Sequence, residues 1–237
     1  EHVQMQGVHG VPIGNLGGGS DHVGFYTHIG VPSAELSFSS PCPVYHSPYD
    51  NLTWYERFAD GKFVFGPTLA RLDGILTLRL ANADVLPYSA AFYAHDLKAH
   101  LNDLLARAKG LDLDVTLDAL TTAIEDLAGV ARRFEDLRER ALQDGDVASG
   151  QMRVVNRTLI GLEKAFIHAP GLQASAWSRS LYACADPYSG YAAWMLPGLR
   201  YEIEARSCQG VADWETIYVG AVRDLAQRLE CAASQLE

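Results

Sequence analysis

The residues best suited to chemistry in this sequence are a tyrosine and a histidine that stand side by side. Tyr45 and His46 lie between Pro43 and Pro48. Each proline fixes its own φ and favours an extended conformation in the residue before it, so this loop is expected to be stiff and free of helix. A stiff loop that holds an imidazole beside a phenol suits a metal ligand or a proton-transfer group, because both depend on position more than on packing. The alternative is an ordinary surface histidine in a turn.

The segment before this loop has the pattern of the end of a layered α/β sheet. An extended stretch at 11–13 leads into the run Gly17-Gly18-Gly19, and residues 32–38 alternate as a strand does. Between them, Ser20 offers an N-cap and Asp21 a favourable charge for a short helix. The glycine run lacks the spacing and the lysine of a phosphate-binding loop, so we interpret it as a tight turn that brings backbone close to a site. Two short strands and one helix do not fold alone, and we expect their sheet neighbours to come from further polypeptide.

The remainder of the chain is predicted to be helical. From Thr53 onward, apolar residues recur with a period of 3.6, which indicates amphipathic helices whose apolar stripes face the core of a bundle. The predicted helices cover roughly 53–58, 63–80, 89–109, 116–143, 154–166 and 211–235. The stretch 174–200 is aromatic and rich in turns instead, and a loop of this length inside a helical domain is uncommon unless it binds something.

Composition places the chain among globular proteins and disfavours some partners. Of its 237 residues, 48% are hydrophobic and 20% are charged. The formal net charge is -10, from 29 acidic and 19 basic residues, which argues against nucleic acid or an anionic membrane as the partner. No apolar run approaches the roughly 20 residues of a membrane span. The chain opens on Glu1 without a start methionine or a signal peptide, and we interpret it as a fragment.

Cysteines and glycosylation sequons leave several possibilities open. The four cysteines lie far apart without a CxxC motif, which argues against a zinc ribbon: Cys42, Cys184, Cys208 and Cys231. Cys184 and Cys208 could pair, although spacing alone does not establish it. Sequons at Asn51 and Asn156 permit glycosylation in a secretory compartment, but such triplets also arise by chance.

Several groups of residues occur here in an order that resembles a known family. They are Leu16-Gly-Gly-Gly-Ser-Asp21, Tyr45-His46-Ser47-x-Tyr49-Asp50, Leu80-Ala81-Asn82 with Val85-Leu86-Pro87, Leu162-Glu163-x-Ala165-Phe166-Ile167, Tyr191-Ala192 and Pro197-Gly198. Together they resemble the glutamate carboxypeptidase II and transferrin receptor group of zinc peptidases over nearly the whole chain. The resemblance implies a mostly α fold. Residues 1–50 would be the C-terminal end of an α/β zinc-peptidase sheet, and residues 51–237 a helical-bundle dimerisation domain.

The resemblance also implies a catalytic centre of which this chain supplies only part. In such enzymes two Zn²⁺ ions per active site share a bridging water, and a glutamate acts as general base. Only the last metal ligand falls within this sequence, and it matches His46. Tyr45 matches a phenol that stabilises the oxyanion, a role in which one donor can be worth about 3 kcal/mol. The missing ligands and base belong to an upstream peptidase segment, so we expect this chain alone to be inactive. One histidine does not by itself select zinc over manganese or cobalt.

Substrate selection is where the sequence departs from the family pattern. A lysine-tyrosine pair that meets the terminal carboxylate of the substrate falls at Gly190-Tyr191, so the charge-assisted bond of the lysine is lost. Two arginines that favour acidic residues fall at Glu35 and Ser37. We therefore expect an aminopeptidase-like or dipeptidase-like exopeptidase acting on neutral or basic peptides, with Ser20 and Asp21 in the wall of the substrate site.

The same resemblance carries expectations about assembly and location. It implies a homodimer formed through the helical domain and a place in the secretory pathway, a vacuole or the lumenal side of the cell surface. The competing hypothesis is non-catalytic, because transferrin receptors keep the architecture and the dimer while losing metal ligands. A third possibility is an independent helical interaction module.

Overall fold

The computed structural model describes residues 5–6, 12–38, 41–145 and 147–237. The chain forms two compact units, one made of Glu1–Ser33 with Tyr88–Glu237 and the other of Ala34–Pro87. The chain as a whole is mostly helical, as predicted. The two units are defined by contacts within the chain, whereas the boundary predicted at residue 50 separates a peptidase domain from a dimerisation domain. That boundary stays a prediction.

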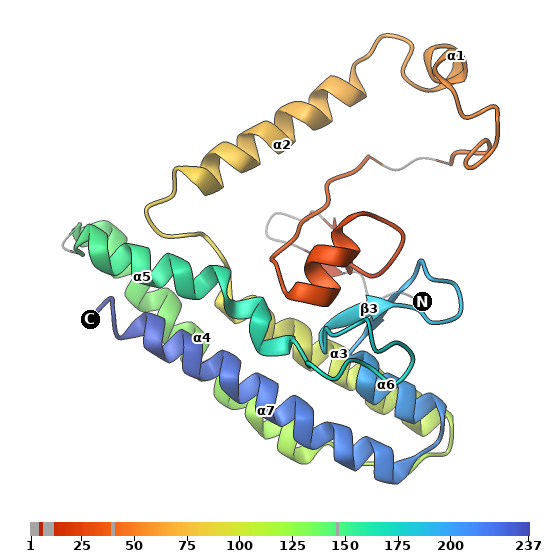
Figure 1. The fold of residues 1–237 in the computed structure, drawn as a ribbon. Coiled ribbons are helices and arrows are strands. Elements are labelled where there is room, and N and C mark those ends of the chain that lie inside the picture. Colours follow the sequence, from red (N-terminus) through yellow and green to blue (C-terminus); the bar gives the residue numbers. More distant parts are fainter. Residues whose placement is uncertain (1–4, 7–11, 39–40, 146) are drawn as a thin grey trace. The chain divides into compact units, whose positions relative to one another are not determined.

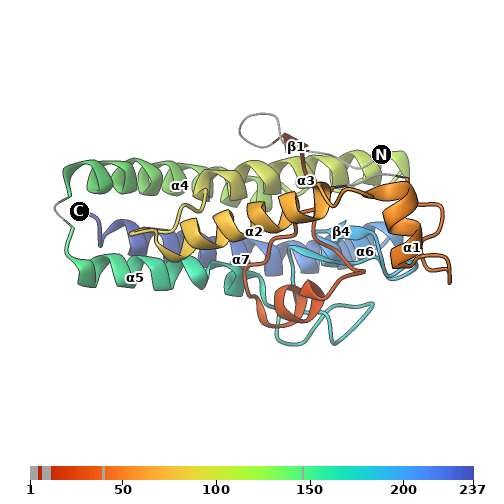
Figure 2. The ribbon, with the colours of Figure 1, turned by 90° about the horizontal axis from the view of Figure 1, so that it is seen from above.

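The first unit contains a bundle of long helices (Figure 1). Its members are α3 (Ala90–Gly110), α4 (Asp118–Asp144), α5 (Ser149–Ile160) and α7 (Cys208–Ala233). The helix α4 packs along both α7 and α3, and α5 packs against α7, as both ribbon views show (Figures 1 and 2). The apolar stripes of α3, α4 and α7 face this core, which confirms the prediction for them. Side chains with almost no exposed surface include Leu97, Leu101, Leu127, Phe134, Val222, Leu225 and Leu229.

The ends of two bundle helices show why they begin and stop where they do. The Ser89 hydroxyl accepts a hydrogen bond from the backbone N–H of Phe92 at 3.3 Å and so caps α3, at the position that the sequence indicates. At its other end, α4 stops at Gly145, whose φ of 70° is the left-handed conformation that glycine adopts without strain. Capping chemistry therefore sets these boundaries to within a residue or two.

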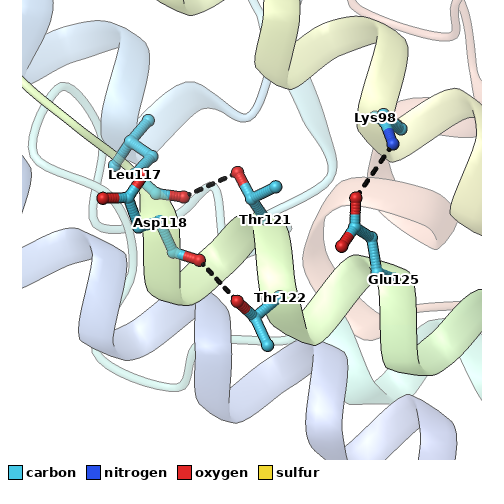
Figure 3. A network of polar contacts seen from close by, with 6 residues as sticks. All are labelled: Lys98, Leu117, Asp118, Thr121, Thr122 and Glu125. Carbon is cyan, nitrogen blue, oxygen red and sulfur yellow. Dashed lines mark hydrogen bonds and ion pairs between the residues drawn. The ribbon is translucent and has the colours of Figure 1, made fainter.

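Polar contacts near the start of α4 tie it to its own first turn and to α3 (Figure 3). The hydroxyl of Thr121 donates to the carbonyl oxygen of Leu117 at 2.8 Å. Lys98 on α3 pairs with Glu125 on α4, with 3.1 Å between Nζ and Oε1. Because both charged groups are exposed, this pair contributes at most about 1 kcal/mol, and the apolar core holds the two helices together.

The aromatic stretch predicted as a loop contains regular structure. It includes a β-hairpin, in which β3 (Ala183–Ala185) pairs antiparallel with β4 (Ala193–Met195), followed by α6 (Pro197–Glu204). Trp194 and Tyr182 are buried there and belong to the core. The loop prediction is wrong for this part because strands of three residues are too short to show a periodic pattern.

The predicted helix over 154–166 is two elements rather than one. The helix α5 ends at Ile160, and a 3-10 helix, η4 (Leu162–Phe166), follows after Gly161. Both elements contribute buried side chains, so the apolar periodicity continues across the break.

The N-terminal part of the first unit has little sheet. The strand β2 (Pro12–Ile13) pairs antiparallel with β1 (Met5–Gln6), and a π-helix, η2 (Gly24–His28), follows. The helical segment already begins at His22, where the backbone N–H of Val23 donates to the backbone oxygen of Ser20 at 3.3 Å; the predicted cap by the Ser20 side chain is not among the hydrogen bonds of the described residues. Residue 11 lies outside the described residues.

No strand forms over residues 32–38, where the sequence pattern predicts one. A strand requires a hydrogen-bonded neighbour, and none of the described residues pairs with this segment. The alternating pattern therefore yields extended chain that belongs to no sheet.

The second unit carries α1 (Leu52–Trp54), a π-helix η3 (Tyr55–Ala59) and α2 (Phe65–Ala81). Asn51 caps the first helix, which begins one residue before the predicted start at 53. The helix α2 has no buried side chain in the described structure, so the expectation that its stripe faces a core is wrong. The physical reason is that this unit offers α2 no second apolar face to pack against.

Two properties of the described residues bear on environment. All four cysteines are free thiols, and Cys184 is the buried one, so the possible pairing of Cys184 with Cys208 is absent. No helix in the described ranges is both long enough and apolar enough to cross a membrane.

Candidate functional site

The loop around His46 is a set of turns, not a helix, as the flanking prolines predict. Ser47 organises it, because its hydroxyl donates to the carbonyl oxygen of Val44 at 2.7 Å and its backbone N–H donates to the same oxygen at 3.0 Å. The Ser47 hydroxyl oxygen also accepts from the backbone N–H of Tyr49 at 3.2 Å. The serine of the Tyr-His-Ser sequence therefore holds the loop closed beneath the two aromatic residues.

The rings of Tyr45 and His46 are stacked on one another. Their centroids lie 3.8 Å apart with 20° between the ring planes, and both residues are exposed. His46 adopts a φ of 60°, a left-handed conformation that costs a residue with a side chain about 1–3 kcal/mol. Strain of this kind persists where the surrounding structure imposes it, and it is concentrated at functional positions.

The residues present fit one metal ligand and not a whole metal site. His46 offers a single exposed imidazole in the loop. In the part of the chain that the structure describes, no three side chains of histidine, cysteine, aspartate or glutamate gather closely enough to hold an ion. A metal bound through His46 would therefore need its other donors from elsewhere.

A hollow lies next along the chain from this loop, within the second unit. It has a volume of about 410 Å³ and is lined by Tyr49, Asn51, Thr53, Trp54, Arg57 and Phe58. Asn51 is structural here, since its Nδ2 donates to the carbonyl oxygen of Pro48 at 3.0 Å while its Oδ1 accepts from the backbone N–H of Trp54 at 3.1 Å. One side chain thus joins the loop to the first helix.

Asp60 is a buried carboxylate of the second unit that no sequence motif above includes. Its two oxygens accept from the backbone N–H groups of Val64, Phe65 and Gly66 at 2.8–3.1 Å, and from the Tyr55 hydroxyl at 3.1 Å. Desolvation opposes its ionisation, but these hydrogen bonds outweigh it and lower the pKa of Asp60 below its ordinary value. An aspartate shortly before a helix is a capping pattern, and that signal could have identified it.

The glycine run lies against the tip of the β3–β4 hairpin. The backbone N–H of Gly18 donates to the carbonyl oxygen of Tyr191 at 3.4 Å. A Cβ added to Gly18 would lie 2.0 Å from the carbonyl oxygen of Gly190, and one added to Gly19 would lie 2.8 Å from the ring of Tyr191. The structure therefore brings the glycine run into contact with two residues assigned to substrate binding.

The hairpin tip is shaped by Asp186. Its Oδ1 accepts from the backbone N–H of Tyr188 and its Oδ2 accepts from the hydroxyl of Ser189, each at 2.8 Å. The bond from the Tyr188 backbone is the largest cause of the lowered pKa of Asp186. Gly190 follows with a φ of 74°, and the side chain of Tyr191 is 57% exposed. The tip thus presents an accessible phenol and no cation at position 190.

The predicted site residues fall into two groups, one in each unit. Ser20 and Asp21 are exposed and follow the glycine run that contacts Gly190 and Tyr191 in the first unit. The second unit holds Tyr45 and His46, with Glu35 and Ser37 exposed on the extended segment before them. The structure brings the glycine run to Gly190 and Tyr191, and Tyr45 to His46, and a common site made of both groups stays a prediction.

Comparison with known proteins gives these features a context. A family model described as "Transferrin receptor-like dimerisation domain" matches residues 115–237, which contain α4, α5, α6 and α7. The probable glutamate carboxypeptidase LAMP1 of Arabidopsis thaliana is 33% identical over 202 residues, which is 85% of this chain and 29% of that protein.

Two further relatives differ in the functions that their names state. Aminopeptidase NAALADL1 of Mus musculus is 29% identical over 66% of this chain and 22% of its own length. Vacuolar protein sorting-associated protein 70 of Saccharomyces cerevisiae is 22% identical over 92% of this chain and 30% of its own length. The chain spans less than a third of the length of these curated relatives.

The helical bundle and the matched residues define a helical dimerisation domain. The chain belongs to the transferrin receptor-like and glutamate carboxypeptidase family, as its motifs predict.

Proposed function

We propose that this chain is the C-terminal portion of a di-zinc exopeptidase. It would supply one metal ligand, His46, an oxyanion-stabilising phenol, Tyr45, and the homodimerisation domain. The observation that carries the proposal is the stacked, exposed pair of rings on a loop whose histidine adopts a left-handed φ of 60°.

The two rings would have separate tasks. His46 would donate one imidazole nitrogen to a Zn²⁺ ion whose other ligands lie outside this chain, and bound zinc would supply an activated water. Tyr45 would donate its hydroxyl proton in a hydrogen bond to the oxygen that becomes negative when water adds to the peptide carbonyl. Stacking against the imidazole would hold the phenol in position before the substrate arrives.

Substrate preference follows from the groups that this chain offers. The hairpin tip presents Tyr191 and no cation at Gly190, and the extended segment presents Glu35 and Ser37 in place of positive charge. These groups would favour neutral or basic peptides over acidic ones. The names of the relatives, a probable carboxypeptidase and an aminopeptidase, support exopeptidase activity of either polarity.

The test is metal content and peptidase activity of the complete parent protein beside its His46→Ala and Tyr45→Phe variants. About two zinc ions per chain are expected in the unmutated protein. His46→Ala should lose metal and activity, whereas Tyr45→Phe should keep metal and lose roughly a hundredfold or more in kcat. His95→Ala, which removes an exposed histidine of α3, is the matched control and should retain both.

The alternative is a non-catalytic homologue whose role is dimerisation and binding, for which the matched dimerisation domain is the supporting observation. An unmutated parent without zinc and without peptidase activity would establish it and refute the enzyme proposal. Placement in the secretory pathway, a vacuole or the cell-surface lumen is part of either proposal, and mass spectrometry of glycans at Asn51 and Asn156 would test it.

A further inference from the structure

A carboxyl group without a positive partner lies between the bundle and the N-terminal segment. Glu163, on η4, accepts a hydrogen bond from the hydroxyl of Tyr93 on α3. Tyr93 stacks on Phe166, with 6.5 Å between ring centroids, and meets the ring of Tyr182 edge-on at 6.0 Å. The hydroxyl that meets the Glu163 carboxyl therefore belongs to an aromatic cluster, and Glu163 itself is half-buried.

The groups that face Glu163 from the neighbouring elements are phenols. They are Tyr26 from η2, Tyr93 from α3 and Tyr88 just before α3. Within the described ranges Glu163 forms no ion pair with lysine, arginine or histidine. On α7, the guanidinium of Arg228 reaches the carbonyl oxygen of Gly161 at 3.3 Å but pairs with Asp224.

Another carboxylate of the first unit, the buried Asp96, has different partners. Asp96 accepts from the hydroxyl of Tyr182, and its Oδ2 lies 3.3 Å from Nε2 of His100. Asp96 thus has a titratable partner, whereas Glu163 has only a phenol. Desolvation raises the pKa of Glu163 above its ordinary value of 4.5, and the hydrogen bond from Tyr93 offsets only part of that increase.

Residues 24–31 pack against η4, the element that carries Glu163. A Cβ added to Gly30 would be 2.8 Å from Cγ1 of Ile167 and 3.3 Å from the backbone oxygen of Glu163. The carbonyl oxygen of Thr27 accepts from the backbone N–H groups of Arg179 and Ser180, both at 2.9 Å. This segment leads along the chain to Tyr45 and His46.

We propose that Glu163 and Tyr93 form a proton latch: while the carboxyl is neutral, residues 24–31 are held on the bundle, and loss of the proton loosens that attachment. An ionised Glu163 has no cation to pair with, so it is stabilised by moving towards water. That movement displaces η4, on which Gly30 and Tyr26 rest.

The direction of the pH dependence follows from linkage. A carboxyl whose pKa is raised by folding contributes stability that is fully present below the unfolded-state pKa, near 4.5, and is lost as the pH rises through the folded-state value. Between these two pKa values, the equilibrium constant for opening the latch should increase about tenfold per pH unit. Above the folded-state pKa it should stay constant.

Hydrogen-deuterium exchange of the complete protein, followed by mass spectrometry, tests this without measuring activity. Peptides covering residues 24–31 and 177–183 contain the amides of Val31, Arg179 and Ser180, which bond to oxygens of the segment. After correction for intrinsic exchange rates, protection in these peptides should fall with rising pH in the unmutated protein. Protection that does not change with pH there would overturn the proposal, whatever the variants do.

Variants separate the latch from general effects of pH. Glu163→Gln keeps an acceptor for Tyr93 and should remove the pH dependence in both peptides. Tyr93→Phe removes the bond that lowers the pKa of Glu163, so the fall in protection should continue to higher pH. Glu215→Gln is the matched control. Glu215 is also a half-buried carboxylate, and it accepts one hydrogen bond, from the backbone N–H of Leu120 at 3.0 Å. This variant should show the same pH dependence as the unmutated protein. An unchanged pH profile in a folded Glu163→Gln variant would refute the latch.

Discussion

At the scale of single residues, backbone approaches backbone closely where the glycine run meets the hairpin tip. Gly18 has no room for a methyl group, because a Cβ there would lie 2.0 Å from the carbonyl oxygen of Gly190. Gly190 itself has open space around its Cβ position but a φ of 74°. The two positions therefore predict different consequences of substitution.

Gly18→Ala should destabilise the first unit by about 1–3 kcal/mol, because the methyl group must displace rigid backbone. Gly14→Ala is the control, since a Cβ at Gly14 meets nothing within 4 Å, and it should change stability by less than about 1 kcal/mol. Chemical denaturation of both variants measures the difference. Equal stability of the two would contradict the packing described for Gly18.

Gly190→Lys should raise kcat/KM of the complete protein for peptides ending in glutamate relative to those ending in a neutral residue. The reason is that it would restore a cation beside Tyr191, which makes a charge-assisted bond to a carboxylate. Gly190→Ala carries the same backbone strain without the charge and should leave the preference unchanged. Faster cleavage of glutamate-terminated peptides by the unmutated protein would refute the expected selectivity.

At the scale of elements, helix starts and helix contacts depend on a few side chains. Three backbone N–H groups at the start of α2 donate hydrogen bonds to the carboxylate of Asp60. The helix α6 approaches α7 where Gly198 meets Trp214. Each contact yields a prediction that concerns one element rather than the entire chain.

Ordering at the start of α2 should be lost in acid. The pKa of Asp60 is lowered from its ordinary 3.8, so its contribution is present above that value and disappears as the pH falls through the folded-state pKa. Asp60→Asn, which has one acceptor oxygen in place of two, should show faster amide exchange at residues 64–66 already at neutral pH. Exchange there that matches the unmutated protein would show that the bonds to Asp60 do not hold the helix start.

Gly198→Ala should destabilise the first unit by about 1–3 kcal/mol, since its Cβ would lie 2.2 Å from Cε3 of Trp214 in a packed interface. Gly220→Ala, at a position of α7 with open space around the Cβ, should stabilise it by about 0.5–1 kcal/mol through helix propensity. Thermal unfolding measures the two changes in Tm, which should have opposite signs. A Tm that falls in both variants, or in neither, would contradict the open or the crowded surroundings described for these glycines.

At the scale of the whole molecule, the matched dimerisation domain leads us to expect that two copies associate. The chain should sediment at twice its monomer mass of 25.9 kDa, and association should strengthen with added salt, because each copy carries a formal charge of -10. Analytical ultracentrifugation at two salt concentrations measures both effects. A monomer at micromolar concentration in both conditions would refute self-association of this chain.

The sequence predicts the bundle well because α3, α4 and α7 are long and carry regular apolar stripes and caps such as Ser89 and Gly145. It predicts the loop of Tyr45 and His46 because proline excludes helix there. It does not reveal the β3–β4 hairpin, whose strands are shorter than one period of any pattern, or the bare face of α2, whose stripe looks like those that are buried. The left-handed φ of His46 and the contact of Gly18 with Gly190 depend on tertiary structure, and no local pattern encodes them.

The double role of Asn51 affects how its sequon should be studied. Replacing this asparagine to remove a sugar would also break the bonds to Pro48 and Trp54, and any loss of metal or turnover would then have two explanations. Thr53 takes part in neither bond, so Thr53→Ala abolishes the acceptor triplet while leaving the His46 loop as it was. In this protein the third residue of the triplet, not the first, is the one to change.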